Sequence, residues 1–211
     1  MGIEKGKFVT LEGCEGSGKS TQIEKLKKYL SDCGKEFLFT REPGGTRISE
    51  DIRRIILNVD YENMTDETEA LLYAAARTQL IGEKILPALD RGEIVLCDRY
   101  IDSSFAYQAY ARSLGYDFVR QINEVAFTRC IPDLTLFFDI SPDEAFQRKG
   151  GADADDRLEQ SGTEFHRRVY EGYLMLCRKF PERIVRIDAR KTPDEVFALV
   201  KDVLTERKII G

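Results

Sequence analysis

The segment Gly13–Ser20 reads GCEGSGKS and matches the pattern GxxxxGK(S/T) at every fixed position. A compact apolar run ends at Glu12, just before this segment, and a helical pattern begins near Lys19. A glycine-rich loop between a strand and a helix can turn successive backbone N–H groups toward a phosphate, while the helix N-terminus adds positive potential. Glycine also permits the positive φ angles and the close approach of an anion that such a loop needs. The segment therefore predicts a phosphate-binding P-loop.

Two side chains of this loop are placed for chemistry on a nucleoside triphosphate. Lys19 can hold the β- and γ-phosphates, and the Ser20 hydroxyl can ligate Mg²⁺. An ATPase or a switch GTPase would share these parts, but the guanine-reading pattern NKxD is absent because no Asn-Lys pair occurs in the chain. The predicted ATP site comprises Gly13, Cys14, Glu15, Gly16, Ser17, Gly18, Lys19, Ser20 and Thr21.

A bound Mg²⁺ also favours a carboxylate at the end of a neighbouring strand. The runs EIVLCD and LTLFFD each end in an aspartate, Asp98 and Asp139 respectively. Asp98 is followed at once by Arg99 and Tyr100, a polar cluster suited to chemistry, whereas Asp139 leads toward a helix start. We therefore predict that Ser20 and Asp98 form the metal shell, with Asp98 acting through water.

Short strand-like runs alternate with helical patterns along the whole chain, which favours a parallel sheet covered by helices. Each run is compact and apolar, as strands buried on both faces require. The sequence therefore predicts an α/β fold of the three-layer P-loop NTPase type, with a five-stranded parallel sheet flanked by helices. The predicted strands are Lys7–Glu12, Phe37–Thr40, Glu93–Asp98, Leu134–Asp139 and Arg183–Asp188.

The segments between the strands carry apolar residues at a period near 3.6, which predicts helices. The longest of these segments contains Pro87, which is expected to kink a helix near its end. Pro193 suits the first turn of the terminal helix. The predicted helices are Lys19–Leu30, Thr46–Leu57, Thr65–Arg91 and Asp194–Arg207.

One segment, residues 147–160, breaks this alternation and reads QRKGGADADDRLEQ. It is rich in Gly and Asp and almost without apolar residues, which by composition alone favours a solvated loop. The alternative is a mobile lid that carries the cations Arg148, Lys149 and Arg157 over a bound phosphate.

The composition limits the possible partners and the compartment. With 32 basic and 37 acidic residues the formal net charge is −5, which does not favour binding to a nucleic-acid backbone. The 5 cysteines include no CxxC pair, so neither a disulfide framework nor a zinc site is expected, and Cys14 is either a small filler or a reactive thiol. No signal peptide or membrane span is apparent, so we expect a cytoplasmic protein.

Three further motifs, TREPGGT at residues 40–46, DRY at 98–100 and DRLE at 156–159, together with the P-loop, resemble the thymidylate kinase family. The resemblance runs over nearly the whole chain. It implies a single kinase domain over residues 1–211, with a lid at about 147–160. It also implies that the γ-phosphoryl group of ATP is transferred to dTMP, giving dTDP and ADP for dTTP synthesis, with Mg²⁺ as cofactor and a homodimer as the assembly.

The resemblance also implies roles for the residues of the acceptor site. Glu15 would face the sugar and the metal-bound waters, and Tyr73 would stack on the pyrimidine, with Arg77 bonding a base carbonyl. Without the resemblance, Tyr73 and Arg77 would be interpreted as a core aromatic and a surface arginine, and Arg41 with Glu42 as a structural ion pair. The substrate-binding set is Glu15, Arg41, Glu42, Tyr73, Arg77, Arg99, Ser104, Tyr107 and Gln108.

Cations are expected to carry the catalysis, because a phosphate acceptor is already anionic and needs no strong base. Gly16 stands where some members of the family have an arginine, so the resemblance implies that the lid supplies that charge. Arg148 is the first choice, with Lys149 as an alternative, and His166 is expected to be structural or exposed. The predicted catalytic residues are Lys19, Arg99, Arg148 and Arg157.

Three other functions stay open at this point. The nearest is a nucleoside monophosphate kinase with a different base preference. A deoxynucleoside kinase would need a general base to activate a neutral hydroxyl. A nucleotide-sensing interaction module would bind nucleotides without robust turnover.

Overall fold

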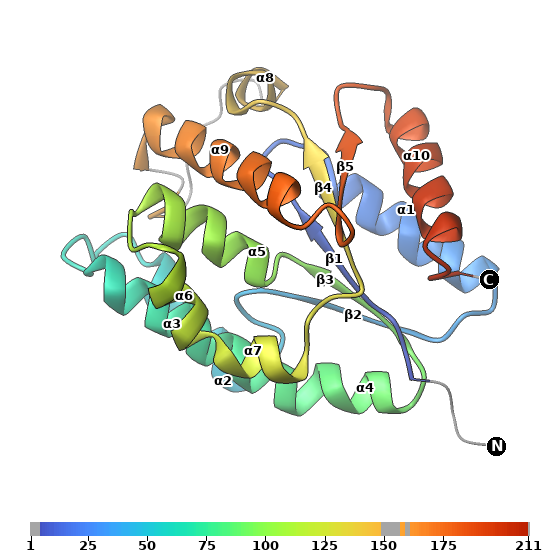
Figure 1. Ribbon diagram of the computed structural model, residues 1–211, viewed down its shortest axis with the longest axis horizontal. Coiled ribbons are helices and arrows are strands. Elements are labelled where there is room, and N and C mark those ends of the chain that lie inside the picture. Colours follow the sequence, from blue (N-terminus) through green and yellow to red (C-terminus); the bar gives the residue numbers. More distant parts are fainter. Residues whose placement is uncertain (1–4, 149–156, 159–160, 211) are drawn as a thin grey trace.

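A five-stranded parallel sheet in the order β2-β3-β1-β4-β5 forms the centre of the computed structural model (Figure 1). The structure describes residues 5–148, 157–158 and 161–210. The predicted sheet is confirmed, and each observed strand lies within a residue or so of its predicted bounds. The strands are β1 (Phe8–Glu12), β2 (Phe37–Arg41), β3 (Ile94–Asp98), β4 (Leu134–Asp139) and β5 (Ile184–Asp188).

The central strand β1 pairs with β3 on one side and with β4 on the other, so that Leu11 lies opposite Asp98 and Glu12 opposite Phe137. The chain leaves β1 toward β2 and later crosses to β4 on the opposite side. This reversal creates a topological switch point at the carboxyl end of β1, where open α/β sheets bind ligands. The P-loop follows β1 and therefore begins at this point.

The helices follow the strands in chain order. Two π-helical turns, η1 and η2, interrupt the α-helices. The segments are α1 (Lys19–Asp32), α2 (Arg47–Leu57), α3 (Asp66–Leu80), η1 (Ile81–Ile85), α4 (Leu86–Asp90), α5 (Ile101–Ser104), η2 (Phe105–Ala111), α6 (Tyr116–Ile122), α7 (Glu124–Arg129), α8 (Pro142–Arg148), α9 (Thr163–Lys179) and α10 (Pro193–Glu206).

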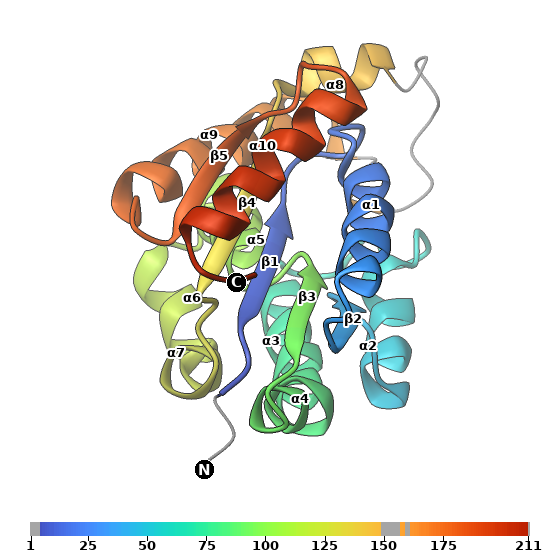
Figure 2. The same ribbon diagram turned by 90° about the vertical axis from the view of Figure 1, so that its right-hand side faces the viewer.

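Helices cover both faces of the sheet, and Figure 2 looks onto the face that carries α1 and α10. Alternate strand residues point to opposite faces, so Phe8 and Val9 belong to different core clusters. Val9 packs with Leu26 of α1 and Val200 of α10, and all three residues are fully buried. Phe8 packs instead in the cluster under α3 to α7 and α9. Two buried layers therefore hold the sheet rigid beneath the P-loop.

The predicted long helix over Thr65–Arg91 is one helical path with a change of winding. It runs as α3, then the π turn η1, then α4, and Pro87 lies in the first turn of α4. The N–H of Leu86 bonds the carbonyl of Ile81, five residues back. A proline ring clashes with the carbonyl four residues earlier in an α-helix, and a wider π turn relieves that clash. The helix therefore passes Pro87 without ending there.

Most of the predicted lid, residues 149–156 and 159–160, lies outside the described residues. Its start at Gln147 and Arg148 belongs to α8, and Arg157 and Leu158 are described separately. The single-domain assignment over 1–211 stays a prediction. Across the described part of the chain, every helix is too short or too polar to span a lipid bilayer.

Candidate active site

The P-loop has the backbone geometry that only glycine adopts easily. Gly18, the residue before α1, has φ 87° and ψ 8°, and Gly13 has φ 149°. A Cβ atom on Gly13 would lie 2.9 Å from the backbone oxygen of Phe138. The glycines therefore allow the loop to curl tightly against β4 and to open α1 with its N–H groups toward the loop.

Lys19 is a buried cation directed back into this loop. Its residue is 7% exposed, and its Nζ donates to the carbonyl of Gly13 over 3.4 Å. Burial lowers the pKa of Lys19, with the charge of Arg99 adding to the effect, while Asp98 and Glu15 oppose it. The Ser17 hydroxyl beside it is buried without a hydrogen-bond partner among the described residues. An anionic ligand in the loop would satisfy both groups.

The carboxylates nearest the loop differ in what already binds them. Asp98 ends β3, and its Oδ1 is buried without a hydrogen-bond partner among the described residues. Asp139, in contrast, accepts from Tyr170 over 2.8 Å and from Arg186 Nε over 3.0 Å. Ser20 is exposed in the first turn of α1. Asp98 and Ser20 therefore fit a hard cation better than Asp139 does.

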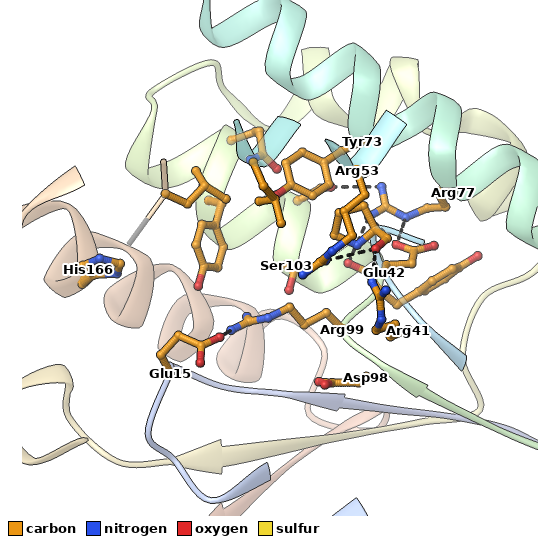
Figure 3. A pocket seen from close by; sticks show the side chains of 17 residues that line it. Glu15, Arg41, Glu42, Arg53, Tyr73, Arg77, Asp98, Arg99, Ser103 and His166 are labelled. Atoms are coloured by element: carbon orange, nitrogen blue, oxygen red, sulfur yellow. Dashed lines mark hydrogen bonds and ion pairs between the residues drawn. The ribbon is translucent and has the colours of Figure 1, made fainter. Parts of the chain in front are cut away.

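Beside the P-loop, a pocket opens between the carboxyl ends of β2 and β3 and the helices α2, α3 and α9 (Figure 3). Every residue of the predicted substrate-binding set lines it. Their contacts with a nucleotide stay predictions. Asp98 also lines this pocket, so it adjoins both the P-loop and the predicted acceptor site.

Arg99 is the cation between the two sites. Its backbone is left-handed, with φ 64°, and its N–H donates to the carbonyl of Leu11 over 2.9 Å. Its guanidinium reaches Glu15 of the P-loop over 3.0 Å, as Figure 3 shows, and lies 5.5 Å from the ring centre of Tyr107. Despite burial, nearby Tyr107, Tyr173 and Glu15 raise the pKa of Arg99 well above its usual value. The side chain is therefore a permanent cation that lines the pocket.

The loop after β2 contains two separate ion pairs instead of one between neighbours. Arg41 pairs with Glu50 of α2 at 2.9 Å and also donates to the carbonyl of Pro43 over 2.7 Å. Glu42 turns the other way and pairs with Arg77 of α3 at 2.7 Å. The alternative of a structural ion pair between Arg41 and Glu42 is therefore wrong, because each of them pairs with a residue of a helix instead.

Arg77 lines the pocket but is almost fully engaged by protein groups. It is 2% exposed, and its Nε donates to Glu42 over 2.7 Å. Its Nη1 donates to Ser104 and Asn123 over 3.0 and 2.6 Å. Its Nη2 donates to the carbonyl of Tyr100 over 3.2 Å. Arg77 therefore ties α3 to the start of α5, whatever it contributes to a bound base.

We expect replacement of Arg77 by methionine to lower the free energy of unfolding by about 3–5 kcal/mol, because the buried carboxyl of Glu42 would lose its partner and would have to stay charged or take up a proton. Burial raises the pKa of Glu42 to about 7 even with Arg77 present, so its charge depends on this partner. Urea unfolding at pH 8 measures the change. A double variant with Glu42→Gln should recover much of the loss, and an unchanged free energy in the single variant would contradict the assignment.

The side of the pocket that is predicted to face the base is lined by Tyr73, Ser104, Tyr107 and Gln108. Tyr73 is half-buried, while the other three are buried. Tyr107 and Gln108 lie on the π turn η2 directly after α5, and such turns are frequent at functional sites. The amide nitrogen of Gln108 donates to Glu69 over 2.9 Å. The amide of Gln108 is therefore held in place by α3.

The two arginines of the predicted lid are bound by groups outside the P-loop. Arg157 donates to the carbonyl of Ile56 over 3.0 Å and pairs with Glu69, which is fully buried. Arg148 donates to the carbonyls of Ala189 and Arg190 over 2.6 and 2.8 Å. Their predicted catalytic roles stay predictions, and each requires these contacts to be exchanged for phosphate.

Several residues in or under the pocket were not predicted from the sequence as part of the site. Arg53, Ser103 and His166 line it, and Glu12 with Tyr173 lies beneath Arg99. His166 was expected to be structural or exposed, yet it reaches the pocket from the first turn of α9. Of these residues Glu12 carried a signal, as a carboxylate directly after the uncharged run of residues 8–11.

The P-loop cysteine is a filler and not a reactive thiol. Cys14 is 6% exposed, and burial raises its pKa to about 11, so it stays protonated at neutral pH. All five cysteines are described, and all are free thiols.

The P-loop can bind a nucleoside triphosphate, and a second pocket lies beside it. Arg99 lines that pocket and also pairs with Glu15 of the P-loop. A kinase that phosphorylates a nucleotide needs two such neighbouring sites. The fold and the site thus define a P-loop nucleotide kinase. Residues 11–200 match the family model described as thymidylate kinase. The chain belongs to the thymidylate kinase family, and it is accordingly an enzyme of the dTMP kinase type.

Individual relatives agree with the family model. A thymidylate kinase of Clostridium novyi (strain NT) is 48% identical over 204 residues, covering 96% of this chain and 100% of the relative. One from Geobacillus sp. (strain WCH70) is 50% identical over 197 residues, covering 92% and 94%. One from Thermoanaerobacter sp. (strain X514) is 47% identical over 201 residues, covering 95% and 96%.

Proposed function

We propose that this chain transfers the γ-phosphoryl group of ATP to dTMP, giving dTDP and ADP for deoxynucleotide synthesis. The position of Arg99 carries the proposal. It stands between the P-loop and the acceptor pocket, 3.0 Å from Glu15 of the loop, with an open pocket beside it. A cation there can hold the phosphate of one nucleotide against the terminal phosphate of the other.

The chemistry rests on positioning and on charge. Lys19 and the backbone N–H groups of the P-loop would bind the β- and γ-phosphates of ATP, and Arg99 would bind the acceptor phosphate. The acceptor oxygen attacks the γ-phosphorus, the bond to the β–γ bridging oxygen breaks, and ADP leaves. Before this transfer, Arg148 would exchange its carbonyl partners, or Arg157 its carbonyl and carboxylate partners, for the γ-phosphoryl group, which would also exclude water.

The proposed cofactor is Mg²⁺, held by the Ser20 hydroxyl and, through water, by Asp98. When bound, it neutralises phosphate charge. The unpartnered buried Oδ1 of Asp98 supports this set. Among the described residues there is no cluster of three possible metal-ligating side chains, which suits an ion bound through one carboxylate and substrate phosphates.

The test is a coupled assay of ADP release with each common nucleoside monophosphate as acceptor. We expect dTMP to be the best acceptor by kcat/KM, because the stacking ring of Tyr73 and the buried Tyr107 favour a pyrimidine deoxynucleotide. A clear preference for another base would replace dTMP as the substrate. Binding of dTMP without ADP release would instead support a nucleotide sensor.

The homodimer is also a proposal, supported by large apolar side chains on two neighbouring helices. Ile48 and Ile55 of α2 are 52% and 43% exposed, and Leu71 of α3 is 51% exposed. The two helices contact each other, with the Ser49 hydroxyl donating to the carbonyl of Ala76 over 2.8 Å. An isologous contact of this face with a second copy would bury these side chains.

We expect the wild-type chain to sediment as a dimer and the Leu71→Asp variant to shift toward monomer, because a charge would have to be buried in the interface. Analytical ultracentrifugation at several concentrations measures the shift. Ile131→Asp is the matched control, since Ile131 is 38% exposed in the segment between α7 and β4. A monomeric wild type, or equal effects of both substitutions, would refute an interface at α2 and α3.

We propose that the protein acts in the cytoplasm. The five free thiols support this, since a reducing compartment keeps cysteines unpaired.

A further inference from the structure

We propose that Glu12, at the carboxyl end of β1, is a positioning residue that fixes both the backbone and the guanidinium of Arg99. The role rests on the proposed function, because Arg99 is the proposed clamp for the acceptor phosphate. Glu12 does not line the pocket itself, because it is 0% exposed and lies beneath residues that do.

The carboxylate of Glu12 is the meeting point of three elements. Its Oε1 accepts from the N–H of Tyr100 over 2.8 Å and from the N–H of Ser103 over 3.3 Å. Its Oε2 accepts from the Ser103 hydroxyl over 2.6 Å and from the Tyr173 hydroxyl over 2.8 Å. The end of β1 is thereby joined to the start of α5 and to α9.

These bonds hold the backbone on both sides of Arg99. The residue is left-handed, with φ 64°, a conformation that is uncommon outside glycine and needs its surroundings to maintain it. The N–H of Arg99 donates to the carbonyl of Leu11, and the N–H of the next residue, Tyr100, donates to the Glu12 side chain. Two consecutive residues of β1 therefore set the turn that directs Arg99 into the pocket.

The same carboxylate also orients a partner of the guanidinium. The hydroxyl of Tyr173 donates its proton to Glu12, which leaves its lone pairs for Arg99. Arg99 Nη1 donates to this hydroxyl over 3.4 Å, and Nη2 pairs with Glu15 on the other side. Glu12 thus acts on the side chain of Arg99 through Tyr173.

A carboxylate at this place is costly for folding. Burial raises the pKa of Glu12 to about 7 and the charge of Asp102 adds to the rise, while Ser103, Arg99 and Tyr173 lower it. Asp102, in contrast, is bound by Arg183 over 2.6 and 2.7 Å. Because the folded pKa lies above the ordinary value of 4.5, the charged form of Glu12 costs stability, increasingly so as the pH rises from about 4.5 to 7.

The test compares Glu12→Ala and Glu12→Gln with the wild type in steady-state assays at pH 8. Glu12→Ala should raise KM for dTMP about tenfold or more, because the Tyr100 and Ser103 donors are released, and leave KM for ATP within about twofold. Glu12→Gln keeps an acceptor for Tyr100 and should show a smaller rise. Asp102→Asn is the matched control, a buried carboxylate bound to Arg183 that should leave the ratio of the two KM values unchanged.

Equal changes in both KM values for Glu12→Ala, or no change in either, would overturn the role. If Glu12→Ala does not fold, Glu12→Gln decides alone, and an unchanged KM for dTMP in that variant also overturns it. Thermal unfolding tests separately whether Glu12 is charged when it is buried in the folded protein. Raising the pH from 5 to 8 should make Glu12→Gln more stable relative to the wild type, and the opposite trend would count against a buried charge. A wild type without turnover of dTMP would refute the proposed function instead.

Discussion

Replacing Arg99 by alanine is expected to lower kcat/KM for dTMP by about a thousandfold, or about 4 kcal/mol, because a cation that is only 17% exposed would be lost from beside the reacting phosphates. The loss has two sources. The acceptor phosphate loses its cation, and Glu15, paired with Arg99 at 3.0 Å, is left to repel the incoming phosphate. KM for ATP should change far less, because Lys19 and the loop N–H groups remain.

The assay follows ADP release at saturating ATP with varied dTMP. Arg99→Lys should restore only part of the activity, because an ammonium group cannot contact Glu15, Tyr173 and a phosphate with the fork of a guanidinium. Arg54→Ala is the matched control, since Arg54 pairs with Asp51 on the surface of α2 with a side chain that is 78% exposed. Full activity in Arg99→Ala would remove Arg99 from the site.

The local parts of this site could be predicted from the sequence because their signals are local. The P-loop needs glycines and Lys19 at fixed spacing, and strands buried on both faces read as short apolar runs. The order of the strands is then limited by the rules for parallel sheets. Asp98 could be favoured over Asp139 on its neighbours alone, and the structure adds the reason that Asp139 is already bound by Arg186 and Tyr170.

The supporting contacts could not be predicted, because they join residues far apart in sequence. Glu12 meets Tyr173 from a helix 161 residues later, and Glu69 meets Arg157 from 88 residues later. No periodicity encodes such pairs. The resemblance to the family identified the residues that line the pocket, but not the partners that hold Arg77 and Gln108 in place. Those partners follow only from the packing of α3 against α5, η2, the loop after β2 and the junction of α6 and α7.

Replacing Lys19 by alanine is expected to lower kcat by about a thousandfold without loss of stability, and the two outcomes have the same cause. The ammonium group is buried next to Arg99, and its pKa is lowered first by burial, so it is held at a cost in the free protein. Asp98 and Glu15 offset this cost only in part, and a bound triphosphate would add further negative charge. Lys19 therefore stabilises the transferred phosphoryl group more than it stabilises the fold.

Single-turnover rates at saturating ATP and dTMP measure the loss, and thermal unfolding without nucleotide measures stability. Lys28→Ala is the matched control on the same helix, where Lys28 pairs with Asp32 and its side chain is 77% exposed. ATP should raise the melting temperature of the wild type and of Lys28→Ala, and raise that of Lys19→Ala much less. An equal shift by ATP in all three proteins would mean that the triphosphate does not contact Lys19, and the P-loop assignment would fail with it.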